Sequence, residues 1–257
     1  MTSPRRPDTL FWVERANVRG EFVTLDPEES HHLLRVHRAE TGATFEATDG
    51  SGVLYRCRLV ESSRTAARGE VVERVARSGE LPGAVRMLVG LPEMHAAESL
   101  VEHAVPLGAS EIVFVECERS GPATLGEAKL ERLRRLAVAG VKQSRRTLLP
   151  DLSVAPRLSE ALEAGSGAGG DGPAPLRLVA DPAGAVPRAG AGLRPQTIVI
   201  TAVGPPGGFS DRETGLLREA GFIPISLGCN RLTTETAALA LLCEARNLLH
   251  TESLRSI

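Results

Sequence analysis

Two glycine-rich segments of the chain each stand between an apolar run and a helical pattern. One reads TAVGPPGGFS over residues 201–210, and the other reads SLGCNRLTTETA over residues 226–237. Parallel α/β sheets bind ligands at the carboxyl ends of their strands, and glycine there lets the backbone approach a ligand and expose its N–H groups. Either segment alone is compatible with an ordinary strand-to-helix turn. Together they predict two walls of one pocket for a nucleotide-like cofactor.

Polar residues in these segments predict where the helices that follow them begin. Ser210 is a candidate N-cap, and Glu213 is placed to complete a capping box with it. Thr233 or Thr234 is placed to cap the last helix of the chain.

A basic helical stretch lies between Lys129 and Arg146, with Glu131 as its only acid. Many bases on one helix suit a face that contacts RNA phosphates, although a cationic helix that is merely solvated has the same composition. A second basic patch lies near the histidines at 31, 32 and 37. The predicted RNA-contacting residues are Arg35, Arg38, Arg134, Arg135, Lys142, Arg145 and Arg146.

The glycine-rich segments belong to a pattern in which strands alternate with helices. The strands are expected at residues 85–91, 111–115, 176–180, 197–203 and 223–227, and the helices at 96–107, 126–144, 211–220 and 233–249. This alternation predicts an α/β domain with a parallel sheet.

Residues 1–80 have a different pattern, with short strand-like runs broken by turns. Strands are expected at residues 22–25, 43–48, 53–60 and 69–75, a helix at 27–38, and a hairpin turn at Asp49-Gly50. A small β-barrel fits this pattern, so we expect two domains, 1–80 and 81–257.

The overall composition excludes several classes of protein. A net charge of −2 argues against a uniformly basic nucleic-acid binder, although it leaves room for a local basic stripe. The four cysteines form no C-x-x-C pair and no metal-ligand spacing with the histidines, so we expect no metal. No apolar run approaches the roughly 20 residues that span a bilayer. We therefore expect a cytoplasmic protein without a membrane partner.

The two glycine-rich segments, in this order and spacing, resemble the small-subunit rRNA uracil-N3 methyltransferase family (RsmE type) of the SPOUT superfamily. That family has a Gly-Pro-Glu-Gly-Gly loop and a Leu-Gly-x-x-Ile-Leu-Arg-x-Glu-Thr-Ala segment. The stretches HHLLRVHR at 31–38, LGA at 107–109 and KQSR at 142–145 agree with it as well. The resemblance extends over nearly the whole chain.

The resemblance implies a PUA-like N-terminal β-barrel and a C-terminal trefoil-knotted SPOUT domain that forms a homodimer. It also implies S-adenosyl-L-methionine as cofactor and methylation of N3 of a uridine in 16S rRNA, free or in the small ribosomal subunit. The cofactor-binding residues that it implies are Leu178, Val179, Ala180, Val203, Gly204, Gly207, Gly208, Leu227, Gly228 and Leu232.

Four positions depart from the family pattern. Pro206 replaces the loop's usual Glu, Thr233 replaces the usual Arg, Glu93 replaces a Lys, and Pro106 replaces an acidic residue. Cofactor contacts made by backbone atoms survive such changes, whereas side-chain roles at these positions do not, which affects catalytic competence and leaves the expected fold unchanged.

Methyl transfer to uracil N3 requires the loss of a proton and a cation that stabilises the developing anion. Candidates for the cation are Arg145 and Arg231, and Glu235 is a candidate to orient the base or to accept its proton. Glu235 is equally typical of a helix start, where the dipole favours an acid. The alternatives are a SPOUT enzyme for another RNA position, a degenerate RNA-binding paralogue with little activity, and a different nucleotide-binding α/β enzyme.

Overall fold

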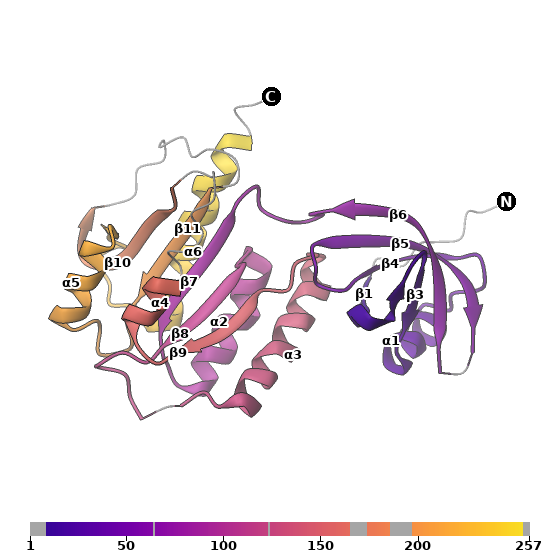
Figure 1. The fold of residues 1–257 in the computed structure, drawn as a ribbon, viewed down its shortest axis with the longest axis horizontal. Helices are drawn as coiled ribbons and strands as arrows, with labels where there is room; N and C mark the ends of the chain where they lie inside the picture. Colours follow the sequence, from indigo (N-terminus) through magenta and orange to yellow (C-terminus); the bar gives the residue numbers. More distant parts are fainter. Residues whose placement is uncertain (1–8, 64, 123, 165–173, 186–196, 254–257) are drawn as a thin grey trace. The chain divides into compact units, whose positions relative to one another are not determined.

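The structure is a computed structural model that describes residues 9–63, 65–122, 124–164, 174–185 and 197–253 (Figure 1). The chain forms two compact units. The first contains residues 1–80 and 138–149, and the second contains residues 81–137 and 150–257. The expected domain boundary at residue 80 therefore falls where the chain first passes between the units, and residues 138–149 return to the first unit.

The first unit is built on one six-stranded sheet in the order β1-β4-β5-β6-β3-β2. Its strands are β1 (Leu10–Trp12), β2 (Val18–Arg19), β3 (Phe22–Leu25), β4 (Thr44–Thr48), β5 (Val53–Ser62) and β6 (Ala67–Ala76). β1 pairs with β4 in parallel, and the other pairs are antiparallel. Strands β4 and β5 form the hairpin predicted at Asp49-Gly50. Strands β1 and β2 were not predicted, although residues 10–13 are a run of β-forming side chains.

Aromatic and aliphatic side chains on one face of this sheet form the core of the first unit. Phe11, Phe45 and Leu59 are fully buried in it. Gly69 of β6 must be a glycine, because a Cβ there would lie 2.6 Å from the ring of Phe45. The register of β5 against β6 shifts twice, and such bulges increase strand twist and help a sheet to curl.

The connections in the first unit include a short 3₁₀ helix and one longer helical stretch. They are η1 (Arg15–Asn17), α1 (Pro27–His31) and η2 (His32–Val36), and η2 has π-helical geometry. Asp26 caps α1 by accepting the Glu29 N–H. The predicted helix at 27–38 is thus present, but its second half is wound more widely than an α-helix.

The second unit is a six-stranded, entirely parallel sheet in the order β12-β10-β11-β7-β8-β9. Its strands are β7 (Ala84–Gly90), β8 (Glu111–Val115), β9 (Asp151–Ala155), β10 (Leu176–Ala185), β11 (Ile198–Val203) and β12 (Ile223–Ile225). The parallel sheet and five of these strands were predicted. Strand β9 was missed, because its apolar residues are interrupted by polar ones and do not form a continuous apolar run.

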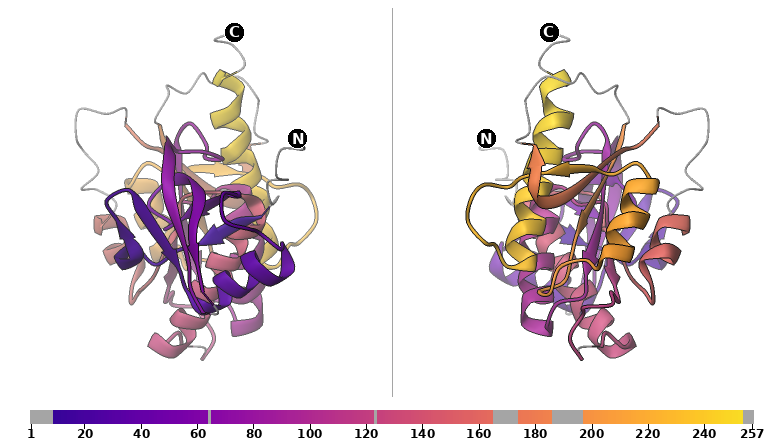
Figure 2. Two further views of the ribbon diagram at one scale, coloured as in Figure 1. Left: turned by 90° about the vertical axis from the view of Figure 1, so that its right-hand side faces the viewer. Right: turned by 90° about the vertical axis from the view of Figure 1, so that its left-hand side faces the viewer.

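Helices cover both faces of this sheet. They are α2 (Met94–Leu107), α3 (Glu127–Ser144), α4 (Leu158–Ala164), α5 (Asp211–Glu219) and α6 (Thr234–Ser253). Leu158 of α4 and Leu217 of α5 pack with Leu88 and Ile200 on one face. Helix α6 packs against α2 and against β7 and β11, and Figure 2 shows α5 and α6 on opposite sides of the sheet.

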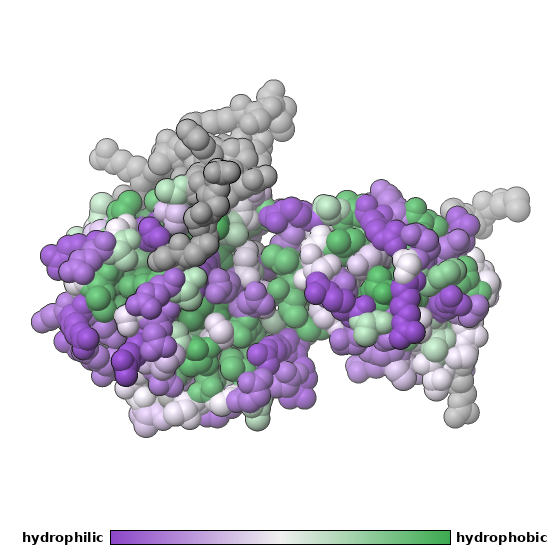
Figure 3. All heavy atoms as spheres, viewed as in Figure 1, coloured by the Kyte–Doolittle hydropathy of each residue, from purple (hydrophilic) through white to green (hydrophobic). Residues whose placement is uncertain are grey.

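Hydrophilic and hydrophobic side chains are interspersed over the face of each unit that Figure 3 shows. None of the helices in the described part of the chain is long and apolar enough to cross a membrane.

Candidate functional site

A tight turn follows β11 and holds the first glycine-rich segment. The Gly208 N–H donates to the Pro205 carbonyl oxygen at 2.7 Å, and Gly208 has a φ of +71°, which favours glycine. Gly204 has no room for a side chain, because a Cβ there would lie 2.8 Å from the Phe209 nitrogen. Gly90 at the end of β7 is equally constrained, since its Cβ would lie 2.2 Å from the Pro205 nitrogen. The backbone of this turn is therefore set by close packing.

The turn leads directly into α5 through the predicted capping box. The Ser210 side chain accepts the Glu213 N–H at 3.2 Å, and the Glu213 carboxylate accepts the Ser210 N–H at 2.8 Å. Glu213 also accepts the Glu118 N–H, which ties the loop after β8 to the start of α5. The prediction for Ser210 and Glu213 is confirmed.

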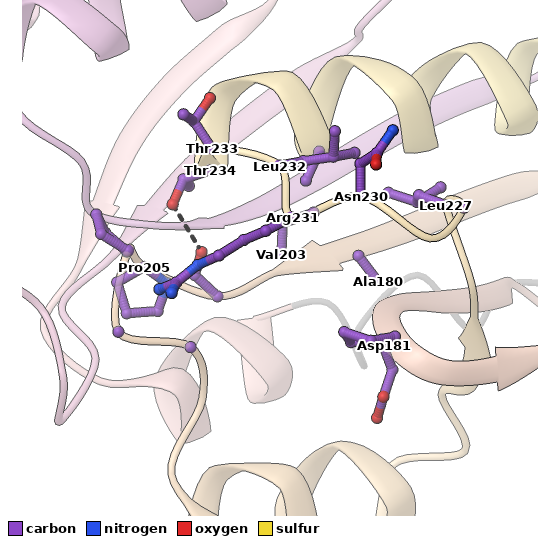
Figure 4. A pocket seen from close by; sticks show the side chains of 17 residues that line it. Ala180, Asp181, Val203, Pro205, Leu227, Asn230, Arg231, Leu232, Thr233 and Thr234 are labelled. Carbon is purple, nitrogen blue, oxygen red and sulfur yellow. Dashed lines mark hydrogen bonds between the residues drawn. The ribbon is translucent and has the colours of Figure 1, made fainter.

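The second glycine-rich segment lies beside the first. The Thr234 hydroxyl at the start of α6 donates to the Gly204 carbonyl oxygen at 3.1 Å, as the dashed line in Figure 4 shows. Gly228 has a φ of +110°, so the turn before α6 also depends on glycine. The two segments form neighbouring walls, as the sequence predicted, and a hydrogen bond joins them.

A bulge in β10 provides a third wall that the sequence did not reveal. Ala180 and Ala185 both pair with Ile225 of β12, so the residues between them leave the ladder. Asp181 lies in this bulge, and its carboxylate accepts the Ala183 N–H at 2.8 Å. A signal for Asp181 was available, since it is the first polar residue after the apolar run 178–180.

These three walls enclose a pocket of about 290 Å³ at the carboxyl ends of the strands (Figure 4). The predicted cofactor residues that line it are Ala180, Val203, Gly204, Gly207, Gly208, Leu227, Gly228 and Leu232. Two others do not: Leu178 is buried inside the sheet, and Val179 lines a neighbouring cavity. Lining residues that the sequence analysis missed include Asp181, Pro182 and Asn230.

The lining of this pocket suits a nucleoside with charged groups. Val203, Leu227 and Leu232 offer apolar surface for a flat ring, and the glycines leave the backbone bare. Asp181 supplies a carboxylate for a hydroxyl or ammonium group. In Figure 4 the Arg231 side chain extends toward the turn at Pro205. Arg231 makes no ion pair with another residue of the described part of the chain.

A second pocket, of about 430 Å³, adjoins the first. The two share the lining residues Pro206, Arg231, Leu232, Thr233 and Thr234. The second pocket also contains Glu235, so two of the predicted catalytic residues, Arg231 and Glu235, come together there. Its remaining titratable groups are Glu93, which the sequence analysis named only as a departure from the family pattern, and His95, which it overlooked. The Glu93 carboxylate oxygen and the His95 Nδ1 are 3.6 Å apart. Three of the four residues that depart from the family pattern, Glu93, Pro206 and Thr233, line this second pocket.

The end of the basic helix belongs to the first unit, where carboxylates hold its cations. Lys142 pairs with Glu29, and Arg145 pairs with Glu46, whose side chain is buried. The backbone of Arg145 has a φ of +58°, a left-handed conformation that is uncommon for a residue other than glycine. A phosphate or a uracil anion would have to compete with Glu29 and Glu46 for these two cations.

Arg146 requires a correction. Its side chain is only 3% exposed and pairs with Glu80, which is equally buried, at 2.6 Å. Glu80 also accepts the N–H groups of Thr147 and Leu148. Because its guanidinium is buried against a carboxylate, Arg146 fixes the chain after α3 to the first unit and is not available to RNA phosphates.

The remaining predicted RNA-contacting residues are accessible to solvent. Arg135 is exposed, and Arg134 is bound at the surface by Glu127 at 2.7 Å, a contact that raises the pKa of Arg134. Arg35 and Arg38 are exposed at and just after η2. Beside them His37 packs against Phe11 and His32, and burial, followed by the charge of His32, lowers the pKa of His37.

Comparison with known proteins agrees with this architecture. Residues 79–245 match the family described as the RNA methyltransferase domain, and residues 25–72 match the RNA methyltransferase PUA domain. A ribosomal RNA small subunit methyltransferase E from Synechocystis is 30% identical over 88% of this chain and 73% of its own. One from Mycobacterium bovis is 26% identical over 91% and 89%.

Solved structures show the same fold. A probable rRNA methyltransferase from Porphyromonas gingivalis superposes with a TM-score of 0.75 at 27% identity, covering 95% of this chain and 99% of its own. A ribosomal RNA small subunit methyltransferase E from Neisseria gonorrhoeae, bound to S-adenosyl methionine, gives a TM-score of 0.73 at 24% identity, covering 93% and 97%.

A parallel sheet with a glycine-walled pocket, together with the matches to the RNA methyltransferase domain and its PUA domain, identifies an RNA methyltransferase. The chain belongs to the ribosomal RNA small subunit methyltransferase E family. The open alternative of a different nucleotide-binding α/β enzyme is thereby excluded. Within the described part of the chain no group of three His, Cys, Asp or Glu residues could hold a metal ion.

Proposed function

We propose that this protein methylates N3 of a uridine in 16S rRNA with S-adenosyl-L-methionine as the methyl donor. The observation that carries the proposal is the pocket at the ends of β10 and β11, whose two glycine-rich walls are joined by the bond from Thr234 to Gly204. The structural neighbour from Neisseria gonorrhoeae, which is bound to S-adenosyl methionine, supports the choice of cofactor. The name of the curated relatives supports small-subunit rRNA as the substrate.

The residues of the pocket fit this cofactor. Gly204, Gly207 and Gly208 present backbone without side chains, and Val203 and Leu232 give the adenine ring an apolar surface. The Asp181 carboxylate suits a ribose hydroxyl or the ammonium group of the methionine part. When bound, S-adenosyl-L-methionine supplies a methyl group on a positively charged sulfur. The glycine walls offer backbone groups, and the departures at Pro206 and Thr233 leave these glycines in place.

The protein contributes to the reaction by holding the two reactants in position and by stabilising the charge that develops on the uracil. Uracil N3 must lose its proton, and the resulting anion spreads over the ring oxygens. Arg231 lies where the two pockets meet and stabilises that anion, because a fixed cation in a partly enclosed site lowers the energy of developing negative charge. Glu235, on the first turn of α6, orients the base. Holding both reactants in line supplies much of the rate.

The RNA must present an unpaired uridine, since base pairing blocks N3. We propose that Arg134, Arg135, Arg35 and Arg38 contact its phosphates, because these side chains reach solvent. Lys142 and Arg145 contribute only where RNA displaces their carboxylates. The substrate is 16S rRNA, free or within the small ribosomal subunit, and the protein works in the cytoplasm.

Two other functions remain in the same family: methylation of another RNA position, and RNA binding with little activity. The deciding experiment is mass spectrometry of 16S rRNA nucleosides from cells that lack the protein. We expect the loss of N3-methyluridine at one position and its return when the purified protein and S-adenosyl-L-methionine are added. A different methylated nucleoside would favour the first alternative, and an unchanged set of nucleosides would favour the second.

We further propose that the chain of the second unit forms a trefoil knot and that the protein is a homodimer through this unit. The motivation besides the family is α6, where Leu239, Ala240 and Leu248 stay partly exposed although the opposite face of the helix is buried. Light scattering at micromolar concentration should give twice the mass of the chain. A monomer mass would contradict this proposal.

A further inference from the structure

The pocket beside the cofactor pocket contains a histidine–carboxylate pair that the proposed function does not use. His95 lies in the first turn of α2, and Glu93 precedes that helix, with its carbonyl oxygen accepting the Ala97 N–H. The Glu93 carboxylate faces the His95 Nδ1 at 3.6 Å. Both side chains are about four-fifths exposed, at 79% and 81%. They are therefore accessible to a substrate in this pocket.

The charged groups that face this pair come from two other elements. Arg231 precedes α6, and Glu235 lies on its first turn. The pocket therefore brings together one imidazole, two carboxylates and one guanidinium, next to the place where the methyl donor is proposed to bind. An arginine does not accept a proton in proteins, so the acceptor must be the imidazole or a carboxylate.

We propose that the target uracil occupies this second pocket and that His95 accepts its N3 proton, with Glu93 as the positioning residue. The inference rests on the proposed function. Imidazole is the most frequent general base in enzymes, because its protonation changes near neutral pH. The Glu93 carboxylate lies on the Nδ1 side of the ring, at 3.6 Å, which leaves Nε2 for the substrate. Arg231 remains the cation for the uracil oxygens.

The step is balanced without any further reactant. The N3–H bond breaks, the proton goes to Nε2 of His95, and the electron pair stays on nitrogen. That pair forms the bond to the methyl carbon, and the electrons of the old bond between sulfur and methyl remain on sulfur as a neutral thioether. The imidazolium then releases its proton to solvent, which its exposure permits.

The central test compares His95→Gln with His103→Gln, a control at another exposed histidine of the same helix. We expect the single-turnover rate of N3 methylation to fall about 10²-fold in His95→Gln and to stay unchanged in His103→Gln. Cofactor affinity, measured by calorimetry, should be the same in both. The rise of the rate with pH in the wild-type protein should lose its His95-dependent limb in the variant.

A second readout does not depend on turnover. An RNA carrying 4-thiouridine at the target position should crosslink under near-ultraviolet light to peptides that contain residues 92–96 or 231–235. Crosslinks confined to other peptides would overturn the inference, because the base would then lie elsewhere. Glu93→Gln should lower the rate about tenfold with little change in RNA affinity, whereas Glu102→Gln, within α2, should leave the rate unchanged.

The outcomes separate the two claims. If the wild-type protein forms N3-methyluridine and His95→Gln does so at full rate, the inference fails and the proposed function stands. If the wild-type protein forms no N3-methyluridine, the proposed function fails and the inference falls with it. If His95→Gln and His95→Asn both lose cofactor binding, His95 has a structural role and the inference is wrong.

Discussion

The cations at the end of α3 and the arginine of the cofactor pocket differ in what holds them. At the end of α3 and just after it, Lys142, Arg145 and Arg146 each pair with a carboxylate of the first unit, namely Glu29, Glu46 and Glu80. In the second unit Arg231 lines two pockets and makes no ion pair with another described residue. A charge that is already neutralised contributes to folding, whereas a charge without a partner is available to a ligand. The basic residues at the end of α3 therefore stabilise the fold, whereas Arg231 is available for function.

The end of α3 and the cofactor pocket also differ in whether side chains or backbone determine their structure. The end of α3 is fixed by charged side chains whose partners lie far along the chain. The pocket is instead shaped by glycine backbone, with Gly90 and Gly204 packed too closely for any side chain. We therefore expect substitutions at the end of α3 to lower the stability of the protein. Substitutions in the pocket should instead lower its affinity for the ligand.

The largest effect is expected from the buried pair in the first unit. Glu80→Ala removes the carboxylate that pairs with Arg146 and accepts two backbone N–H groups, so the free energy of unfolding should fall by about 3–5 kcal/mol. Urea denaturation measures this decrease in the free energy of unfolding. Glu73→Ala is the control, because Glu73 pairs with Arg56 at the surface and its removal should lower the free energy of unfolding by less than about 1 kcal/mol. Equal decreases in the two variants would remove the distinction between buried and exposed pairs.

The next effect tests the backbone of the pocket. Gly208→Val should lower the affinity for S-adenosyl-L-methionine at least about 100-fold, because a β-branched residue strains a φ of +71° and distorts the turn. A steric clash within the free protein is not the cause, since a Cβ at Gly208 meets nothing within 4 Å. Gly215→Val in α5 is the matched control, as that position is equally open but does not have a positive φ. Calorimetry showing native affinity in Gly208→Val would place the cofactor elsewhere.

A third effect decides which arginine acts in catalysis. Arg231→Ala should lower kcat about 10²-fold while cofactor affinity changes little, since the uracil anion loses its cation. Arg145→Ala should keep its turnover at saturating RNA, because Glu46 already holds that guanidinium. Single-turnover kinetics measure both variants. The reverse result, with turnover abolished only in Arg145→Ala, would make Arg145 the catalytic cation.

The smallest effect concerns the exposed turns of α3. Arg134→Ala combined with Arg135→Ala should weaken RNA binding and reduce the salt slope of log K by roughly 0.7–0.9 for each phosphate that is no longer bound. Cofactor affinity should not change. Arg74→Ala, which removes a surface-paired arginine outside the predicted RNA-contacting set, is the control and should leave the slope as it is. An unchanged slope in the double variant would identify this part of α3 as a solvated face.

Sequence reasoning located the pocket because its signals are local. Gly204 and Gly208 mark a turn after an apolar strand, and Ser210 and Glu213 lie three residues apart, as a capping box requires. It missed Asp181, which enters the pocket only because β10 bulges against β12. It also missed His95, which reaches the site through the packing of α2 beside α6.

By itself the sequence determined the alternation of strands and helices, the two glycine walls and the family, because these depend on residues close together along the chain. Only the tertiary structure decided which cations are held by carboxylates. Lys142, Arg145 and Arg146 look like one basic cluster, yet their carboxylates lie 113, 99 and 66 positions away. Ion pairing depends on distances of a few ångströms in space and on burial, and neither can be read from a charge pattern.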